Sequence, residues 1–590
     1  MPTECKYFPE ECWEQIFSRL PHQSDLESVS LVCKQFLALT NRICLHLSVI
    51  HHDTLSKLIH RFPNLISIDL SDFHSDLDLI LFELANCVSY IPNLRQLDFS
   101  RQIKLPIEGL KELGRKFKGL RVFKCRKLAI INDSYLNTIA ESFAFLEELD
   151  ISYPRPFDRP PNPSELDLTD SGIEFLSVNL TNMRKINISG NYRITDRSLV
   201  ALSMNCLNLQ AIQVEDCALL TLKEVLSMQR ACAALSWISV SNIHNGLSSS
   251  GFKCLTTSSR ALQTLGISNS IISDELLFLL AKASLPLYKL SLSWYFLTDE
   301  SINDLSQYLQ SLVTIYLSNC VKLSISTFFT LATNCPSLED VCMKNIRLRV
   351  KDCFHNGAKN PRIRTVNLQR NSYLDDDSLT KIALMCPNME SLYVCLCRSV
   401  IEAGIASALE VCNHIRNLEF VGCPLIKHIG NGAELPNLEV INAADSTLSD
   451  EGLAIIGSRC SRLLKLNLHN YEGVTIEGIQ AMVKNCTSLR EINLKRCVQV
   501  SVNSLNSIVS FSSSLRRVFP PKSDGFHDSL RGFSWHNGCL VSSSCKMSFE
   551  LITLRFYQGG LLKGKGKERY VGGEVTDIYD VDIDKFPTLN

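Results

Sequence analysis

Three groups of residues in this chain could in principle do chemistry: adjacent carboxylates, cysteines and one glycine-rich segment with lysine. The carboxylates follow a hydroxyl in Ser273-Asp274-Glu275, Thr298-Asp299-Glu300 and Ser449-Asp450-Glu451. Two neighbouring carboxyl groups could act as a general acid and a general base. The same triplets also describe a helix start, where the hydroxyl caps the helix and each acid favours its dipole by ~0.3–1 kcal/mol. We therefore assign these acids a structural role.

The 24 cysteines could form disulfides, bind a metal or act as nucleophiles. Twelve of them recur in two registers, one three residues before the first apolar residue of a strand and one eight residues after it. The first register holds Cys206, Cys232, Cys335, Cys386, Cys412, Cys460 and Cys486, and the second holds Cys217, Cys320, Cys397, Cys423 and Cys497. A cysteine that recurs once per repeat is a small buried hydrophobe, and stacked equivalents project in parallel, which is unsuited to a disulfide. We expect reduced core thiols, and since no His/Cys cluster has zinc-site spacing, no metal.

The glycine-rich segment from Gly559 to Lys565 nearly matches a phosphate-binding P-loop. However, Gly566 stands where a Ser or Thr would hold magnesium, and no strand–helix–strand pattern follows. The chain also lacks the linear signatures of serine hydrolases, zinc peptidases and kinases, and its 13 histidines are scattered. The sequence therefore predicts no enzyme and no cofactor.

The elements that carry these residues are short and repetitive, as residues 183–210 illustrate. Ile186 and Ile188 alternate with polar residues as in a half-buried strand, and Thr195-Asp196 then caps a helix with Leu199 and Leu202 on one face. A unit this short cannot bury its own apolar face, so it must stack on copies of itself.

The copies can be counted from the first apolar residue of each L-x-x-L-x-L strand. Most successive anchors are 25–27 residues apart, from Leu65 to Leu515. About seventeen such units resemble the cysteine-containing class of leucine-rich repeat, which is commonly found behind an F-box. The resemblance implies an α/β fold, a leucine-rich-repeat solenoid over residues 49–520 with a curved parallel sheet inside and helices outside.

Three intervals depart from this period. Between Leu146 and Met183 the excess residues include Pro154, Pro156, Pro160, Pro161 and Pro163, which predict a protruding loop. The interval from Ile415 to Leu438 is short, so its helical limb should be reduced. After Pro520-Pro521 no further anchor is found, and the glycine-rich residues 521–590 are predicted to form a disordered tail.

The first 48 residues have a different architecture. Pro9 begins a helix with Trp13, Ile16, Phe17 and Leu20 on one face. Ser24 and Glu27 have capping-box spacing and predict a second helix, with Leu26, Val29, Cys33, Phe36 and Leu37 on its inner side. A module of this size buries too little area to be stable alone, so one interpretation is a cap on the open end of the solenoid.

These residues also resemble the F-box, the motif that docks onto the Skp-type adaptor of cullin–RING ubiquitin ligases. The match lies in Phe8-Pro9-Glu10, Ile16-Phe17, Leu20, Asp25-Leu26 and residues 30–36, SLVCKQF, with Phe8 where the family more often has Leu. The resemblance implies that Phe8, Pro9, Ile16, Leu20, Leu31 and Val32 bind the adaptor or shape the bound surface.

Composition bounds the remaining possibilities. No apolar run approaches the ~18 residues of a membrane span, and the acidic N-terminus is unlike a secretory signal. The formal charge of −1 gives no general attraction to phosphate backbones, and no local basic stripe was recognised. We therefore expect a cytoplasmic or nuclear protein that binds neither membrane nor nucleic acid.

A stacked array offers an extended concave sheet for binding. Most of its outward residues are small or polar, whereas Trp237, Tyr316 and Tyr393 occupy outward strand positions and Trp294-Tyr295 follow a strand. Because aromatic residues are often interface hot spots, these five are the predicted substrate-binding residues. The alternative is that they only pack against neighbouring repeats.

Together these features indicate the substrate-recognition subunit of a Skp–cullin–F-box (SCF-type) ubiquitin ligase. It would hold an unknown protein substrate on the solenoid for ubiquitination and proteasomal degradation. An alternative is a non-ligase repeat scaffold or inhibitor whose N-terminal helices serve only as a cap. A receptor gated by a small molecule, as among plant relatives, would need clustered cations, whereas only isolated ones such as Arg370 and Arg398 were found.

Overall fold

The computed structural model describes residues 8–20, 26, 29–50, 55–154, 168–243, 261–268, 277, 280–281, 285–293, 296–346, 348, 359–429, 434–471, 473–501, 504–521 and 540–541. Contacts divide the chain into two compact units, Met1–Val541 and Ser542–Asn590. The second unit lies outside the described residues, and so does the Gly559–Lys565 segment.

One parallel sheet runs through the described part of the first unit. Each of its twenty strands pairs with the next strand along the chain, from β1–β2 to β19–β20. The strands are β1 (His46–Ser48), β2 (Ser67–Asp69), β3 (Gln96–Asp98), β4 (Val122–Lys124), β5 (Glu148–Asp150), β6 (Lys185–Asn187), β7 (Ala211–Glu215), β8 (Trp237–Ser241), β9 (Thr264–Ser268), β10 (Lys289–Ser293), β11 (Thr314–Ser318), β12 (Asp340–Lys344), β13 (Thr365–Asn367), β14 (Ser391–Tyr393), β15 (Asn417–Glu419), β16 (Val440–Asn442), β17 (Lys465–Asn467), β18 (Glu491–Asn493), β19 (Arg517–Phe519) and β20 (Leu540–Val541).

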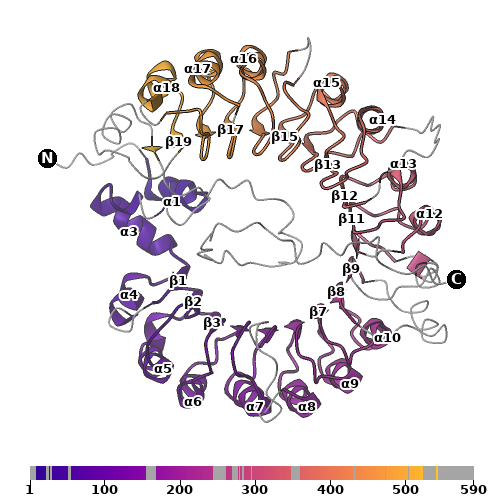
Figure 1. Ribbon diagram of the computed structural model, residues 1–590. Coiled ribbons are helices and arrows are strands. Elements are labelled where there is room, and N and C mark those ends of the chain that lie inside the picture. The colour runs from indigo at the N-terminus through magenta and orange to yellow at the C-terminus, as the bar shows by residue number, and fades with distance from the viewer. Residues whose placement is uncertain are drawn as a thin grey trace. The chain divides into compact units, whose positions relative to one another are not determined.

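Helices alternate with these strands and cover one face of the sheet. Figure 1 shows the helices on the outer side of the curve and the strands on its inner side. The helices are α1 (Glu10–Ser18), α3 (Lys34–Ile43), α4 (Leu55–Arg61), α5 (Leu77–Asn86), α6 (Ile107–Lys116), α7 (Asp133–Ser142), α8 (Asp170–Asn179), α9 (Asp196–Asn205), α10 (Leu222–Ser227), α12 (Asp299–Ser306), α13 (Ile325–Asn334), α14 (Asp376–Met385), α15 (Glu402–Val411), α16 (Asp450–Arg459), α17 (Ile476–Asn485) and α18 (Leu505–Phe511), with 3-10 turns η2 (Val88–Tyr90) and η3 (Met228–Arg230). This confirms the predicted α/β leucine-rich-repeat solenoid.

The core is a stack of equivalent apolar residues, one set from each repeat. Leu97, Phe123, Leu149 and Ile186 are register partners in β3 to β6, and all four are buried. Side chains that repeat at the same strand position meet across the sheet, so each repeat buries its apolar face against the next.

The recurring cysteines lie in this core, as predicted. All twelve are buried free thiols, and burial raises the pKa of Cys206 and of Cys335 to about 12. Each register also hydrogen-bonds to the preceding repeat: the Sγ of Cys412 donates to the carbonyl oxygen of Cys386 (3.2 Å), and that of Cys497 to Leu468 (3.0 Å). The cysteines therefore join repeats without forming disulfides.

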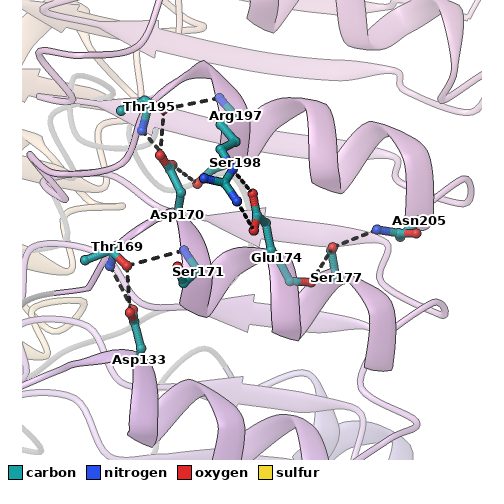
Figure 2. A network of polar contacts seen from close by, with 10 residues as sticks. All are labelled: Asp133, Thr169, Asp170, Ser171, Glu174, Ser177, Thr195, Arg197, Ser198 and Asn205. Atoms are coloured by element: carbon teal, nitrogen blue, oxygen red, sulfur yellow. Dashed lines mark hydrogen bonds and ion pairs between the residues drawn. The ribbon is translucent and has the colours of Figure 1, made fainter.

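A second link joins the starts of neighbouring helices, and Figure 2 shows two examples. The carboxylate of Asp133 in α7 accepts hydrogen bonds from the backbone N (2.8 Å) and Oγ1 (2.6 Å) of Thr169, the residue that caps α8. Asp170 in α8 makes the same two contacts with Thr195, the cap of α9. The pattern recurs at Asp196–Thr221, Asp299–Ser324 and Asp450–Thr475.

The predicted irregular intervals have the following outcomes. Pro156, Pro160, Pro161 and Pro163 lie outside the described residues. Between β15 and β16 the described residues 420–429 and 434–439 contain no helix, in agreement with the short interval there. The sheet continues past residue 520, because Leu540–Val541 pairs with β19.

Candidate protein-binding surfaces

The N-terminal module has a small aromatic core between α1 and α3. Phe17, Phe36 and Leu39 are buried, and Trp13 and Leu20 pack against them. The ring centroids of Phe17 and Phe36 are 4.9 Å apart. Arg42 in α3 forms ion pairs with Glu10 (2.5 Å) and Glu14 (3.0 Å) in α1. The two helices are thus held together by one aromatic cluster and by the two ion pairs of Arg42.

The predicted second helix is not continuous through residue 33, which corrects the sequence interpretation. Leu31 and Val32 form a turn, and α3 begins only after Cys33, whose backbone is extended and whose Sγ accepts a hydrogen bond from the backbone N of Phe36 (3.4 Å). The capping box at Ser24 and Glu27 lies outside the described residues. The apolar spacing continues across the break, whereas the break itself depends on the Cys33 side chain acting as a local helix cap. The amphipathic pattern alone therefore did not reveal it.

This turn leaves two apolar side chains in solvent. Leu31 is 86% exposed and Val32 is 66% exposed. Phe8, Pro9 and Ile16 are also exposed, whereas Leu20 is partly buried against the aromatic core. Exposed apolar side chains gathered on a small module are typical of a protein-binding surface.

On the concave face the predicted aromatic residues are separate from one another. Trp237 begins β8 between the smaller register partners Ala211 and Thr264, and it is half-buried. Tyr316 lies in β11, where Lys289 Nζ is 5.7 Å from the centre of its ring. Burial raises the pKa of Tyr316 and lowers that of Lys289. Trp294 and Tyr295 lie outside the described residues.

Tyr393 occupies the predicted outward strand position but is only 5% exposed. It lies in β14 between its register partners Asn367 and Glu419, and burial raises its pKa to about 12. Two strands, β12 and β13, lie between it and Tyr316, so the two residues are three strand spacings apart, roughly 14 Å. The structure therefore does not gather the aromatic residues into one cluster, and little of the Tyr393 ring is available to a partner.

Many polar residues of the concave face have a local structural role. The side-chain oxygen of an Asn or Asp at the fifth position of L-x-x-L-x-L accepts a hydrogen bond from the backbone N two residues later. This stabilises the turn that ends the strand. The residues are Asp69, Asp98, Asp150, Asn187, Asn367, Asn442, Asn467 and Asn493.

Glu419 departs from this pattern. It is a glutamate at the same register position, only 6% exposed, and Nδ2 of Asn442 lies 3.4 Å from its Oε2. Burial raises its pKa to about 7, against the opposing hydrogen bond from Asn442. Sequence reasoning did not single out this residue, since nothing in the local pattern distinguishes a buried glutamate from a solvated one.

The expectation that the chain has no local basic stripe does not hold for residues 95–127. This stretch contains eleven Lys or Arg and three Asp or Glu, a strong local excess of positive charge. Part of it is neutralised by ion pairs, which are Arg101–Asp72, Lys111–Glu108, Arg115–Glu112, Lys116–Glu112 and Arg121–Glu147. This local excess of Lys and Arg can be read from the sequence, but the near-zero net charge of the whole chain does not reflect it. The absence of a nucleic-acid partner stays a prediction.

Neither a metal cluster nor a membrane span is found in the part of the chain that the structure describes. No group of three His, Cys, Asp or Glu side chains there could hold a metal ion. None of its helices is long and apolar enough to cross a membrane.

Comparisons with known proteins bear on the N-terminal module. Residues 7–49 match the family model described as F-box-like. A crystal structure of the Rad7 and Elc1 complex in yeast is similar at 15% identity, covering 72% of this chain and 89% of that chain with a TM-score of 0.40. A crystal structure of the TLR13–ssRNA13 complex is similar at 13% identity, covering 81% and 86% with a TM-score of 0.37. Likeness at this level carries no information about function. The chain thus has an F-box-like domain at its N-terminus, followed by a leucine-rich-repeat solenoid.

Proposed function

We propose that this chain is the substrate-recognition subunit of an SCF-type ubiquitin ligase. The observation that supports it best is the exposure of Leu31 and Val32 within a segment that matches the F-box-like family. In this proposal Phe8, Pro9, Ile16, Leu31 and Val32 contact the Skp-type adaptor, and Leu20 shapes their surface by packing beneath them. The adaptor links the chain to a cullin–RING ligase in the cytoplasm or nucleus.

The solenoid in this proposal holds a target protein, and the mechanism is proximity. A target tethered to the ligase presents its lysines to the charged ubiquitin carrier at a high effective concentration. No residue of this chain then has to make or break a bond. The half-exposed Trp237 and Tyr316 on the concave face, with Trp294 and Tyr295, are the proposed contacts to the target.

The proposal is tested by co-purifying the full chain with a Skp-type adaptor. Leu31→Asp combined with Val32→Asp should lower adaptor binding at least tenfold, because two buried apolar contacts would be replaced by unpaired charges. Pro9→Ala should weaken it less. Met204→Asp is the matched control, since Met204 in α9 is 71% exposed and lies outside the F-box-like segment.

The alternative function is a scaffold or inhibitor whose N-terminal helices only cap the solenoid. In that case no Skp-type adaptor would co-purify with the wild-type chain. The Leu31 and Val32 variants would then leave all protein interactions unchanged. Absence of the adaptor would exclude the ligase role, and unchanged adaptor binding by the variants would exclude Leu31 and Val32 as its contacts.

A further inference from the structure

A row of residues, charged in several stretches, runs along the edge of the sheet where the strands begin. It consists of the residue just before each strand and includes Arg121, Glu147 and Arg184. Glu147 forms ion pairs with both arginines, at 3.6 Å to Arg121 and 3.4 Å to Arg184. Further along the row the signs alternate again, with ion pairs Arg364–Glu390 and Arg416–Glu439. In these two stretches each arginine is therefore matched by a neighbouring carboxylate, whereas Nη1 of Arg95, just before β3, donates to the carbonyl oxygens of Leu94 (3.3 Å) and Gly119 (3.4 Å).

The alternation stops near the end of the solenoid. After Glu439 the row continues with Leu464, Arg490 and Arg516. Arg490 and Arg516 are direct neighbours, because the backbone N of Arg516 donates to the carbonyl oxygen of Arg490 (2.8 Å). Both side chains are exposed. Like charges on adjacent strands repel each other, so this pair is unfavourable unless an anion lies against it.

No carboxylate of the described residues pairs with these two arginines. Nη1 of Arg516 donates to the carbonyl oxygen of Ser513 (2.8 Å), and the guanidinium of Arg490 has no hydrogen bond or ion pair within the described chain. The nearby Glu491 is 3.6 Å from Arg517 instead. The two guanidinium groups thus keep most of their donors free.

The arginines line an open hollow of about 370 Å³, together with Leu464, Thr487, Ser488 and Ser514. The Oγ of Ser514 donates to the carbonyl oxygen of Leu489 (2.9 Å), whereas the hydroxyls of Thr487 and Ser488 make no hydrogen bond within the described residues. The hollow therefore offers guanidinium and hydroxyl donors, and no carboxylate lines it. This donor set matches a tetrahedral oxyanion.

We propose that this hollow binds a phosphate monoester group. The two arginine side chains would donate to its terminal oxygens, and Thr487 and Ser488 would donate to those that remain. A phosphate monoester carries close to two negative charges at neutral pH, so one group neutralises both arginines, whereas one carboxylate neutralises one.

The site is independent of the proposed ligase role, because it involves neither the F-box-like segment nor the concave aromatic residues. The phosphate could belong to a modified protein or to a free small molecule. A labelled peptide with one phosphoserine, O-phosphoserine itself and inorganic phosphate distinguish these sources. If the free compounds compete as well as the peptide, the site recognises the group alone; if only the peptide binds tightly, flanking residues contribute.

The test measures binding of the phosphoserine peptide to the full chain by fluorescence anisotropy. Arg490→Gln and Arg516→Gln together should weaken binding at least tenfold, and the unphosphorylated and glutamate forms of the peptide should bind at least tenfold more weakly. Arg416→Gln is the matched control, since it removes an arginine of the same row that already pairs with Glu439.

A second measurement does not depend on the choice of peptide. Inorganic phosphate should raise the melting temperature of the wild-type chain more than chloride at equal ionic strength, and this difference should vanish in the double variant. The inference is wrong if neither the peptide nor phosphate binds, if the double variant binds as well as the wild type, or if the glutamate peptide binds equally.

Discussion

The carboxylate of Asp170 joins two repeats by accepting hydrogen bonds from Thr195, at 2.8 Å from its backbone N and 2.6 Å from its Oγ1. Ser198 adds a third donor, its Oγ, at 2.5 Å. Burial opposes ionisation, but the hydrogen bonds from Ser198 and Thr195 outweigh it and hold the pKa of Asp170 below its ordinary value. The acid in the first turn of one helix therefore fixes the cap of the next (Figure 2).

The neighbouring acids Asp299 and Glu300 allow this role to be tested within one helix turn. Asp299 accepts hydrogen bonds from the backbone N and Oγ of Ser324 and from Oγ1 of Thr327, whereas Glu300 is exposed. Asp299→Ala should cost ~1–3 kcal/mol locally, because charge-assisted hydrogen bonds are lost. Hydrogen exchange of the first amides of α13 should become faster. Glu300→Ala removes a charge at the same helix end and should leave these amides unchanged.

Gly478 leaves the space that the side chain of Asp450 occupies. A Cβ at position 478 would overlap Oδ1 of Asp450 and lie 2.5 Å from its Cγ. Gly478→Ala should therefore destabilise the chain by ~1–3 kcal/mol, although alanine is the better helix former. The free energy of unfolding in urea measures the effect. The double variant with Asp450→Ala should lose less than the sum of the single variants, and Gly266→Ala, with its nearest atom at 3.6 Å, should be close to neutral.

The buried Glu419 predicts a dependence of stability on pH. Its pKa is about 7 in the folded chain, compared with ~4.3 when unfolded. In the folded state Glu419 keeps its proton to a higher pH than in the unfolded state. Its contribution to stability is therefore fully present below about pH 4 and is lost as the pH rises toward 7. Glu419→Gln should be more stable than wild type by ~1–3 kcal/mol at pH 8, with little difference near pH 4. Equal unfolding free energies at pH 8 would contradict this, and the exposed Glu300→Gln serves as control.

Trp237 is a half-buried predicted aromatic residue with the smaller register partners Ala211 and Thr264. Trp237→Ala should lower capture of the protein target at least tenfold in cells with blocked proteasomes, as measured by mass spectrometry, and leave adaptor binding intact. Tyr288→Ala is the control, because Tyr288 is an exposed aromatic residue at the strand-entry edge. Undiminished capture would place the target elsewhere on the solenoid.

The fold followed from patterns that are local in the chain. The spacing of Leu146, Leu149 and Ile151 recurs in every repeat, and a strand–helix unit of this length has no stable arrangement except stacking. The same logic correctly placed the recurring cysteines in the core. The F-box resemblance was also local, and its match over residues 7–49 agrees with it.

Contacts between repeats needed the tertiary structure. Asp170 and Thr195 are far apart in the sequence, and a triplet such as Thr-Asp-Arg does not reveal which neighbour its acid will meet. For the same reason the pattern could not show that Tyr393 is covered, that Cys33 interrupts a helix, or that Arg490 and Arg516 stand together without a carboxylate. Periodicity determines which face of the sheet a residue lies on, but its burial and charge partners depend on side chains one repeat away.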